Sequence, residues 1–270
     1  MPESAPPNPR LYGQPPYRVA VVHGGPGAGG EMAPVAQYLA ASHGVIEPIQ
    51  TDPSLDGQVA ELRRLLRQCG TPPLTLIGYS WGAWLSYLVA AADHDLVAQL
   101  VLVSSGPFEH KYLEQLHANR NSRLSPAEQT EYAHIVECLT SGKPLEDADA
   151  LVGRLGTLGS KTADFAPLTD PPPVDHLGPG GDIFQGVTQE AMARRKSGAL
   201  LQAGRQIQCP VLAIHGDYDP HPAAGVEEPL RQVLDKFEFT LLPNCGHTPW
   251  IESRAQAPFY QCLLAAIPPA

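Results

Sequence analysis

The chain lacks any apolar run long enough to cross a membrane, and its first 16 residues contain no apolar signal-peptide core. Its five cysteines are scattered and form no Cys-x-x-Cys pair. No basic run offsets the formal net charge of −10. These absences argue against a membrane protein, a disulfide-stabilised secreted scaffold and a nucleic-acid-binding protein, and we expect a cytoplasmic protein.

The apolar residues that are present fall into alternating strand-like and helix-like segments. Continuous apolar runs at 18–22, 75–77, 99–104 and 209–215, a short run at 45–49 and the alternating run at 237–242 predict strands. Apolar stripes at helical spacing predict helices over 55–69, 226–236 and 251–267. No internal repeat is present. The alternation predicts an α/β fold, with a mostly parallel sheet covered by helices on both faces.

The most informative segment is the Gly-x-Ser-x-Gly sequence centred on Ser80, between a strand-like run and an alanine-rich, helix-like run. This context predicts a sharp strand-to-helix turn that strains the Ser80 backbone and exposes its hydroxyl as a nucleophile. Gly78 and Gly82 are required because side chains there would collide where strand and helix pack closely. A glycine-rich turn that merely contains a serine is the alternative.

A second glycine-rich loop, His23-Gly24-Gly25-Pro26-Gly27, follows the strand-like run at 18–22. Without side chains in the way, its backbone N–H groups can turn towards an anionic oxygen. We expect one oxyanion donor at Gly25 and the other at Trp81, the residue after the nucleophile. A flexible Gly/Pro turn is the alternative interpretation of this loop.

Two later loops carry an acid and a histidine. The run at 209–215 leads into a loop with the carboxylates Asp217 and Asp219, and the run at 237–242 leads into a loop that reaches His247. All these groups follow the ends of predicted strands, where open parallel sheets place their sites. The order along the chain is nucleophile, acid, histidine.

A metal site is an alternative use of the acid loop. His215, Asp217, Asp219 and His221 alternate, so an extended segment would place them on one face, and His23 and His247 could come near. No His-x-x-x-His or paired Cys-x-x-Cys motif supports this alternative. We therefore expect neither a metal nor another cofactor.

Together these motifs resemble the α/β-hydrolase superfamily over residues 17–106 and 207–267. The His-Gly-Gly-Pro-Gly loop and the Gly-Tyr-Ser-Trp-Gly elbow look most like its proline iminopeptidase branch. The resemblance implies Ser80 as nucleophile, His247 as general base and Asp219 as orienting acid. In this family the acid lies three residues after the strand's glycine, here Gly216. Asp217, a plausible turn residue, remains the alternative acid.

Three domains are expected. Residues 1–16 would be a flexible arm, 17–106 and 207–270 the α/β-hydrolase core, and 107–206 a helical cap over the elbow. Helices are expected over 109–119, 126–139, 145–158 and 189–201, with breaks at 167–173 and 178–181. Such a cap would shape a pocket and exclude water, although a surface insertion without function is the alternative.

Three functions fit these observations. The first is a serine hydrolase of small esters, thioesters or amides, and the second is a proline iminopeptidase-like exopeptidase, so the partner is a small-molecule or short-peptide substrate. An exopeptidase needs carboxylates that bind a free amine. The acidic residues of the cap region are Glu109, Glu114, Asp164, Asp175, Asp182 and Glu190, among others. The third is a non-catalytic binding protein that keeps the fold. Oligomeric state is not predicted.

Overall fold

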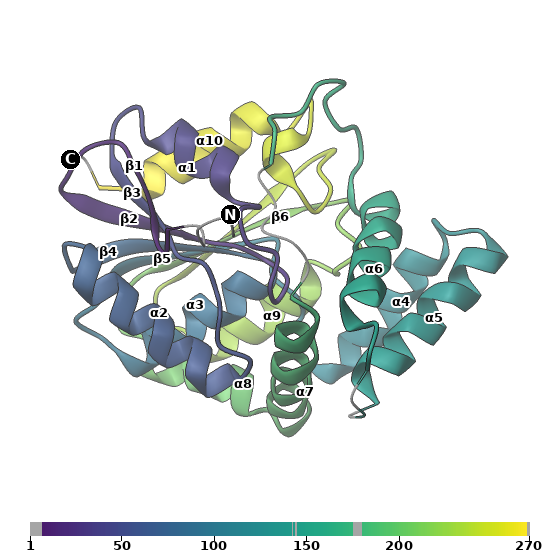
Figure 1. The fold of residues 1–270 in the computed structure, drawn as a ribbon. Coiled ribbons are helices and arrows are strands. Elements are labelled where there is room, and N and C mark those ends of the chain that lie inside the picture. Colours follow the sequence, from purple (N-terminus) through teal and green to yellow (C-terminus); the bar gives the residue numbers. More distant parts are fainter. Residues whose placement is uncertain (1–6, 142, 144, 175–179, 269–270) are drawn as a thin grey trace, which may run out of the picture.

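A seven-stranded sheet runs through the protein, whose computed structural model describes residues 7–141, 143, 145–174 and 180–268 (Figure 1). The strands are β1 (Arg10–Tyr12), β2 (Tyr17–Val22), β3 (Gly44–Glu47), β4 (Leu74–Tyr79), β5 (Val97–Val103), β6 (Val211–Gly216) and β7 (Phe237–Leu242). Their order is β1-β3-β2-β4-β5-β6-β7, and every neighbouring pair is parallel except β1 and β3. The predicted mostly parallel sheet is confirmed.

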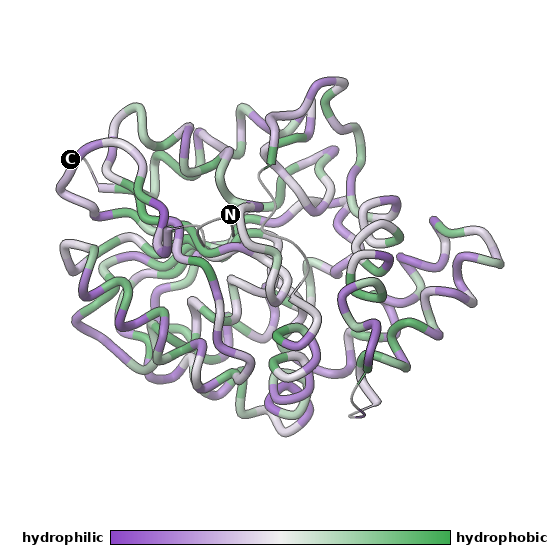
Figure 2. The backbone as a smooth tube through the Cα atoms, in the orientation of Figure 1, coloured by the Kyte–Doolittle hydropathy of each residue, from purple (hydrophilic) through white to green (hydrophobic). Residues whose placement is uncertain are grey.

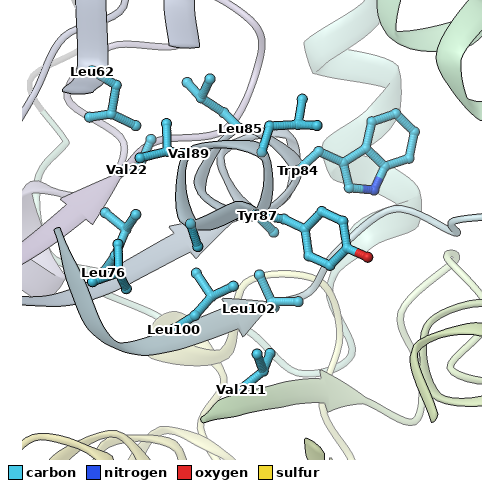
Figure 3. Close-up of a cluster of buried hydrophobic side chains, with 14 of the residues drawn as sticks. Val22, Leu62, Leu76, Trp84, Leu85, Tyr87, Val89, Leu100, Leu102 and Val211 are labelled. Atoms are coloured by element: carbon cyan, nitrogen blue, oxygen red, sulfur yellow. The ribbon is translucent and has the colours of Figure 1, made fainter. Parts of the chain in front are cut away.

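Both faces of the sheet are buried because its strands are apolar on both sides. Ala20 and Val22 of β2 face one apolar cluster, while Val19 and Val21 face another. Figure 3 shows the first cluster, in which side chains of β4, β5 and β6 meet those of α3. Figure 2 shows hydrophobic residues concentrated along these strands. Full burial of each such side chain contributes about 1.5–3 kcal/mol to folding.

Helices cover both faces, as predicted (Figure 1). Helices α1 (Ala33–Leu39) and α10 (Gln256–Ala266) pack on one face, and α2 (Leu55–Cys69), α3 (Trp81–Ala92) and α9 (Ala224–Val233) on the other. The 3-10 helix η3 (Pro249–Ile251) precedes α10. None of the helices among the described residues has the length and apolar character needed to span a bilayer.

Strand β1 differs from the flexible arm expected over residues 1–16. Arg10 pairs with Glu47 and Tyr12 with Val45 in an antiparallel ladder, and the Tyr12 hydroxyl donates to the buried Glu47 carboxylate at 2.6 Å. Backbone pairing with a strand more than 30 residues away supplies the order that local sequence did not indicate. Residues 1–6 of the expected arm lie outside the described residues.

The segment between β5 and β6 is helical, as expected. It contains η1 (His110–Tyr112), α4 (Leu113–Asn121), α5 (Pro126–Thr140), α6 (Ala148–Ala163), α7 (Gly181–Ser197), α8 (Ala199–Gln202) and η2 (Ala203–Gln206). Ser125 forms a capping box with Glu128 at the start of α5, which helps that helix to begin at Pro126. Helices α4, α5 and α6 stand beside the sheet in Figure 1. We call this segment, 107–206, the helical insert.

Two details of the helical insert depart from the sequence prediction. Helix α7 begins at Gly181, in the glycine segment expected to break structure, because the Asp149 carboxylate accepts the N–H of Gly181 at 2.7 Å. The end of the insert is also part of the core. Leu200 and Leu201 belong to the first apolar cluster, and the Leu201 carbonyl accepts the Tyr87 hydroxyl at 2.8 Å.

Candidate active site

The elbow after β4 has the strained geometry that the sequence predicts. Ser80 connects β4 to α3 with φ 53° and ψ −114°, a conformation that a residue with a side chain rarely adopts. A Cβ atom on Gly78 would lie 2.2 Å from the Gly82 carbonyl oxygen, and one on Gly82 would lie 2.4 Å from that of Val22. Both glycines are therefore required by close packing, and the turn directs the serine side chain away from the sheet.

The structure joins Ser80, His247 and Asp219 in one hydrogen-bonded chain. His247 Nε2 lies 3.1 Å from Ser80 Oγ, and His247 Nδ1 lies 2.8 Å from Asp219 Oδ2. Asp219 follows β6 and is buried, whereas His247 follows β7 and is partly buried. The three residues lie 28 to 167 positions apart in sequence, so the carboxyl ends of three strands bring them together.

The charges around Asp219 and His247 shift the pKa values of both side chains. Burial acts to raise the pKa of Asp219, but His247, His221 and His215 outweigh it and hold that pKa well below its usual range. Burial acts to lower the pKa of His247, but the charge of Asp219 and its hydrogen bond raise it overall. A carboxylate that stays ionised beside a more basic imidazole suits a histidine that must take up a proton.

Asp217, the alternative acid, contacts a different group. Its Oδ1 accepts the backbone N–H of Cys245 at 3.2 Å, which links the loop after β6 to the loop after β7. The alternating set considered for a metal is thus divided. Asp219, His221 and His247 place one ligand atom each within 4.8 Å of one another, a group that includes neither Asp217 nor His215.

Of the two positions predicted as oxyanion donors, Trp81 directly follows Ser80, and Gly25 directly follows Gly24, on which a Cβ would lie 3.2 Å from Ser80 Cβ. Trp81 is the first residue of α3, so its N–H has no acceptor within the helix. Gly25 has φ 109°, and a Cβ there would lie 2.7 Å from the backbone nitrogens of Gly27 and Ala28. Only glycine fits this turn, which leaves the loop backbone unobstructed by a side chain. The donor roles of Gly25 and Trp81 remain predictions.

A buried polar network holds this loop against the elbow. The Trp81 indole N–H lies 3.0 Å from Gln50 Oε1 and 3.2 Å from Gln58 Oε1. Gln50 donates its amide to the His23 carbonyl at 2.9 Å, and its backbone N–H lies 3.1 Å from His23 Nε2. Burial lowers the pKa of His23 to about 4, so this histidine is a neutral structural residue. No sequence motif indicates that Gln50 and Gln58 meet Trp81.

Two carboxylates, those of Glu31 and Asp164, lie close to the hydrogen-bonded chain of Ser80, His247 and Asp219, and no sequence motif places them there. A Cβ on Gly24 would lie 2.8 Å from Glu31 Oε2 and 3.2 Å from Ser80 Cβ, so Glu31 and Ser80 approach the same glycine. Glu31 Oε2 is buried and has no hydrogen-bond partner among the described residues. Burial raises the pKa of Glu31 to about 7, against the opposing influence of His247.

Asp164, one of the acidic insert residues considered for amine binding, is the second of these carboxylates. Its Oδ1 accepts the backbone N–H of Thr248, next to His247, at 3.2 Å. Burial raises its pKa. Of the other candidates, Glu190 accepts the Leu55 N–H at 3.0 Å and Glu109 pairs with Lys111, while Asp175 lies outside the described residues. The local sequence around Glu31 and Asp164 contained no motif that could have identified them.

Comparison with known proteins identifies the family of most of the chain. Residues 19–260 match the alpha/beta hydrolase family. A search of curated protein sequences found no match.

Similar solved structures extend over almost the full length. VinJ has a TM-score of 0.63 and 18% identity, with 96% of this chain and 95% of that chain covered. A putative lipase from Acinetobacter baumannii has a TM-score of 0.61 and 18% identity, covering 96% and 87%. Proline iminopeptidase from Mycobacterium smegmatis has a TM-score of 0.59 and 14% identity, covering 95% and 92%. At these identities the likeness shows the fold alone.

Proposed function

The chain belongs to the alpha/beta hydrolase family, and on this premise we propose that it is a serine hydrolase of small esters, thioesters or amides. Ser80 is the nucleophile, His247 the general base and Asp219 the acid that orients it. The proposal is carried by the hydrogen-bonded chain of these three side chains at a strained strand-to-helix turn. A non-catalytic binding protein would not need this geometry.

The reaction follows from the protons of His247. With its Nδ1–H donated to Asp219, the imidazole keeps a lone pair on Nε2, 3.1 Å from the Ser80 hydroxyl. Nε2 takes the hydroxyl proton as Oγ attacks the substrate carbonyl, and the N–H groups of Gly25 and Trp81 stabilise the oxyanion. The imidazolium then protonates the leaving group, and an acyl group remains on Ser80.

Water completes the cycle by the same route. His247 takes a proton from water, the hydroxide attacks the acyl carbonyl, and the second tetrahedral intermediate collapses with return of the proton to Ser80 Oγ. Each oxyanion donor typically contributes about 3 kcal/mol to such transition states.

A fluorophosphonate probe tests the nucleophile directly. The probe should label the protein once, and Ser80→Ala should abolish labelling while leaving the circular dichroism spectrum and thermal unfolding intact. Ser86→Ala is a matched control because Ser86 is a buried serine of the same helix α3. Labelling that persists in Ser80→Ala would overturn the assignment.

A proline iminopeptidase-like exopeptidase is the second candidate. The observation that favours it is the pair of carboxylates Glu31 and Asp164 close to Ser80 and His247. A substrate ammonium is poorly tolerated in a buried site unless carboxylates compensate its charge, and these two residues offer that compensation.

A further inference from the structure

Asp219 has a second imidazole partner besides His247. While Oδ2 faces His247, Oδ1 lies 2.8 Å from His221 Nδ1 and accepts the backbone N–H of His221 at 2.9 Å. His215 supports the same arrangement, since its Nε2 lies 2.8 Å from the His221 carbonyl oxygen and 3.6 Å from Asp219 Oδ2. The acid of the proposed triad is therefore held from both oxygens.

Arg120 and Asp219 select the same tautomer of His221, the one with the proton on Nδ1, because the ionised Asp219 carboxylate can only accept. Arg120 Nη2 lies 3.2 Å from His221 Nε2, and a guanidinium has donors but no acceptor. His221 Nε2 must then accept, which leaves the proton on Nδ1, where it is donated to Asp219. Burial lowers the pKa of His221 to about 3, and this is consistent with a neutral ring that has one defined tautomer.

Arg120 belongs to the helical insert, not to the core that carries Asp219 and His247. It lies in α4, and its Nη1 lies 2.5 Å from the Tyr132 hydroxyl of α5. Its neighbour Asn119 donates to the Pro220 carbonyl at 3.0 Å. The contact with His221 is therefore made only when α4 is seated on the loop after β6.

We propose that Arg120 and His221 are positioning residues that make the orientation of Asp219 depend on the seating of α4. With α4 in place, His221 has a single tautomer and holds Oδ1 of Asp219. If α4 moves away, His221 Nε2 loses its donor and Asp219 alone holds the ring, so the ring and the carboxylate turn more freely relative to His247. The inference rests on the proposed function, because it gives Asp219 the orienting role.

Other charged groups near this arrangement define the controls. Arg123, just after α4, lies with its guanidinium 3.6 Å above the Tyr218 ring and interacts favourably with the Asp219 charge. Its guanidinium lies over Tyr218 and makes no hydrogen bond with His221 among the described residues. It has the same charge as Arg120 and also joins the helical insert to the loop after β6. Arg123→Met therefore removes a comparable charge but leaves the Arg120 donor to His221 Nε2 in place.

The test uses four variants of the full chain: Arg120→Met, His221→Asn, the double variant and the control Arg123→Met. An asparagine amide can replace Nδ1–H as donor to Asp219 but has no ring nitrogen to accept from Arg120. The rate constant of fluorophosphonate acylation at Ser80 reports on the triad without a known substrate. Histidine ¹⁵N NMR spectra report the hydrogen bond at His221 Nε2 independently of activity.

We expect Arg120→Met to lower the acylation rate constant about tenfold, the size expected for loss of one hydrogen bond to a charged group. Its His221 Nε2 signal should shift because that nitrogen loses the hydrogen bond from Arg120, while Nδ1 stays protonated. The charge of Arg120 also lowers the pKa of His247, so rates are compared at a pH well above that pKa. There Arg120→Met should have no further effect in the His221→Asn background, because the coupling partner is gone. Arg123→Met should leave the His221 Nε2 signal in place and the acylation rate within about twofold of the unmodified protein.

Two results would overturn the inference. One is an equal loss from Arg120→Met in the presence and absence of the His221 ring, which would make Arg120 a general support of the fold. The other is an unchanged chemical shift of His221 Nε2 in Arg120→Met. If the proposed function is wrong, the probe does not label even the unmodified protein. NMR still reports the hydrogen bond at His221 Nε2 in that case.

Discussion

The carboxylate of Glu252 accepts the backbone N–H of Gly246, the residue before His247, at 2.7 Å. The same carboxylate accepts the N–H groups of Phe165 and Ala166, just after α6, at 2.5 and 2.7 Å. One fully buried side chain therefore ties the loop of the proposed base to the helical insert.

Replacing Glu252 should weaken both folding and acylation. In Glu252→Gln one acceptor oxygen becomes an NH₂ group that faces N–H donors, and each buried N–H left without a partner costs about 1–3 kcal/mol. We expect a lower free energy of unfolding in urea and slower fluorophosphonate labelling. Glu227→Gln, which disturbs only an exposed pair with Arg231, should change stability by less than about 0.5 kcal/mol.

The two acids of the loop after β6 should differ in their effect on the chemistry. Asp219→Asn removes the charge that orients His247 and should lower the acylation rate by about 10⁴-fold, as loss of the triad acid does elsewhere. Asp217→Asn leaves an amide oxygen for the Cys245 N–H and should have a much smaller effect. Stopped-flow acylation by an activated ester measures both variants, and the reverse ranking would move the acid to Asp217.

Activity should fall as the pH drops through the pKa of His247, because only the neutral imidazole can take the Ser80 proton. Burial acts to lower that pKa, but Asp219 raises it overall, which places the midpoint of the acid limb above the ordinary histidine value of about 6.5. The pH profile of kcat/KM measures this midpoint.

A chelator should leave the same activity unchanged. Loss of activity on chelation, restored by a divalent ion, would instead favour a metal held by Asp219, His221 and His247.

Glu31 should influence where this acid limb lies. Its negative charge helps to raise the pKa of His247, and burial raises the pKa of Glu31 itself to about 7. Glu31→Gln removes the charge, and we expect the midpoint to move to lower pH. Glu137→Gln, an exposed residue of α5, should leave the profile in place. An unmoved midpoint in Glu31→Gln would show that Glu31 does not act on His247.

Short-chain p-nitrophenyl esters should be hydrolysed faster than prolyl p-nitroanilide. An activated ester needs little beyond the nucleophile and the oxyanion donors, whereas an anilide of a free amino acid also needs its ammonium to be bound. Parallel initial-rate measurements compare the two classes. Faster cleavage of the free anilide, lost when its amine is acetylated, would promote the exopeptidase candidate.

Much of the fold follows from local patterns, but several site residues do not. The apolar runs gave the central strands, and the stripe over Leu55–Cys69 gave α2 with the bounds observed. Strand β1 and the start of α7 were missed because distant partners, Glu47 and Asp149, stabilise them. Their order depends on tertiary contacts that no short window of sequence contains.

The motif loops identified Ser80, Asp219 and His247, and the fold brings these three side chains together. The surrounding residues carry no comparable signal. Glu31, His221 and Glu252 contact groups up to 101 positions away, and the alternation that put His221 beside Asp219 did not indicate its contact with Arg120. Local spacing can therefore predict the reacting groups of this site but not the groups that support them.

The backbone of Ser80 has a consequence for how such a sequence changes over generations. At φ 53° a side chain is strained by about 1–3 kcal/mol, whereas glycine adopts positive φ freely. Ser80→Gly should therefore raise folding stability while it removes the hydroxyl. A gene copy released from selection for hydrolysis would drift towards glycine at this position, and a serine there persists only while its chemistry is used.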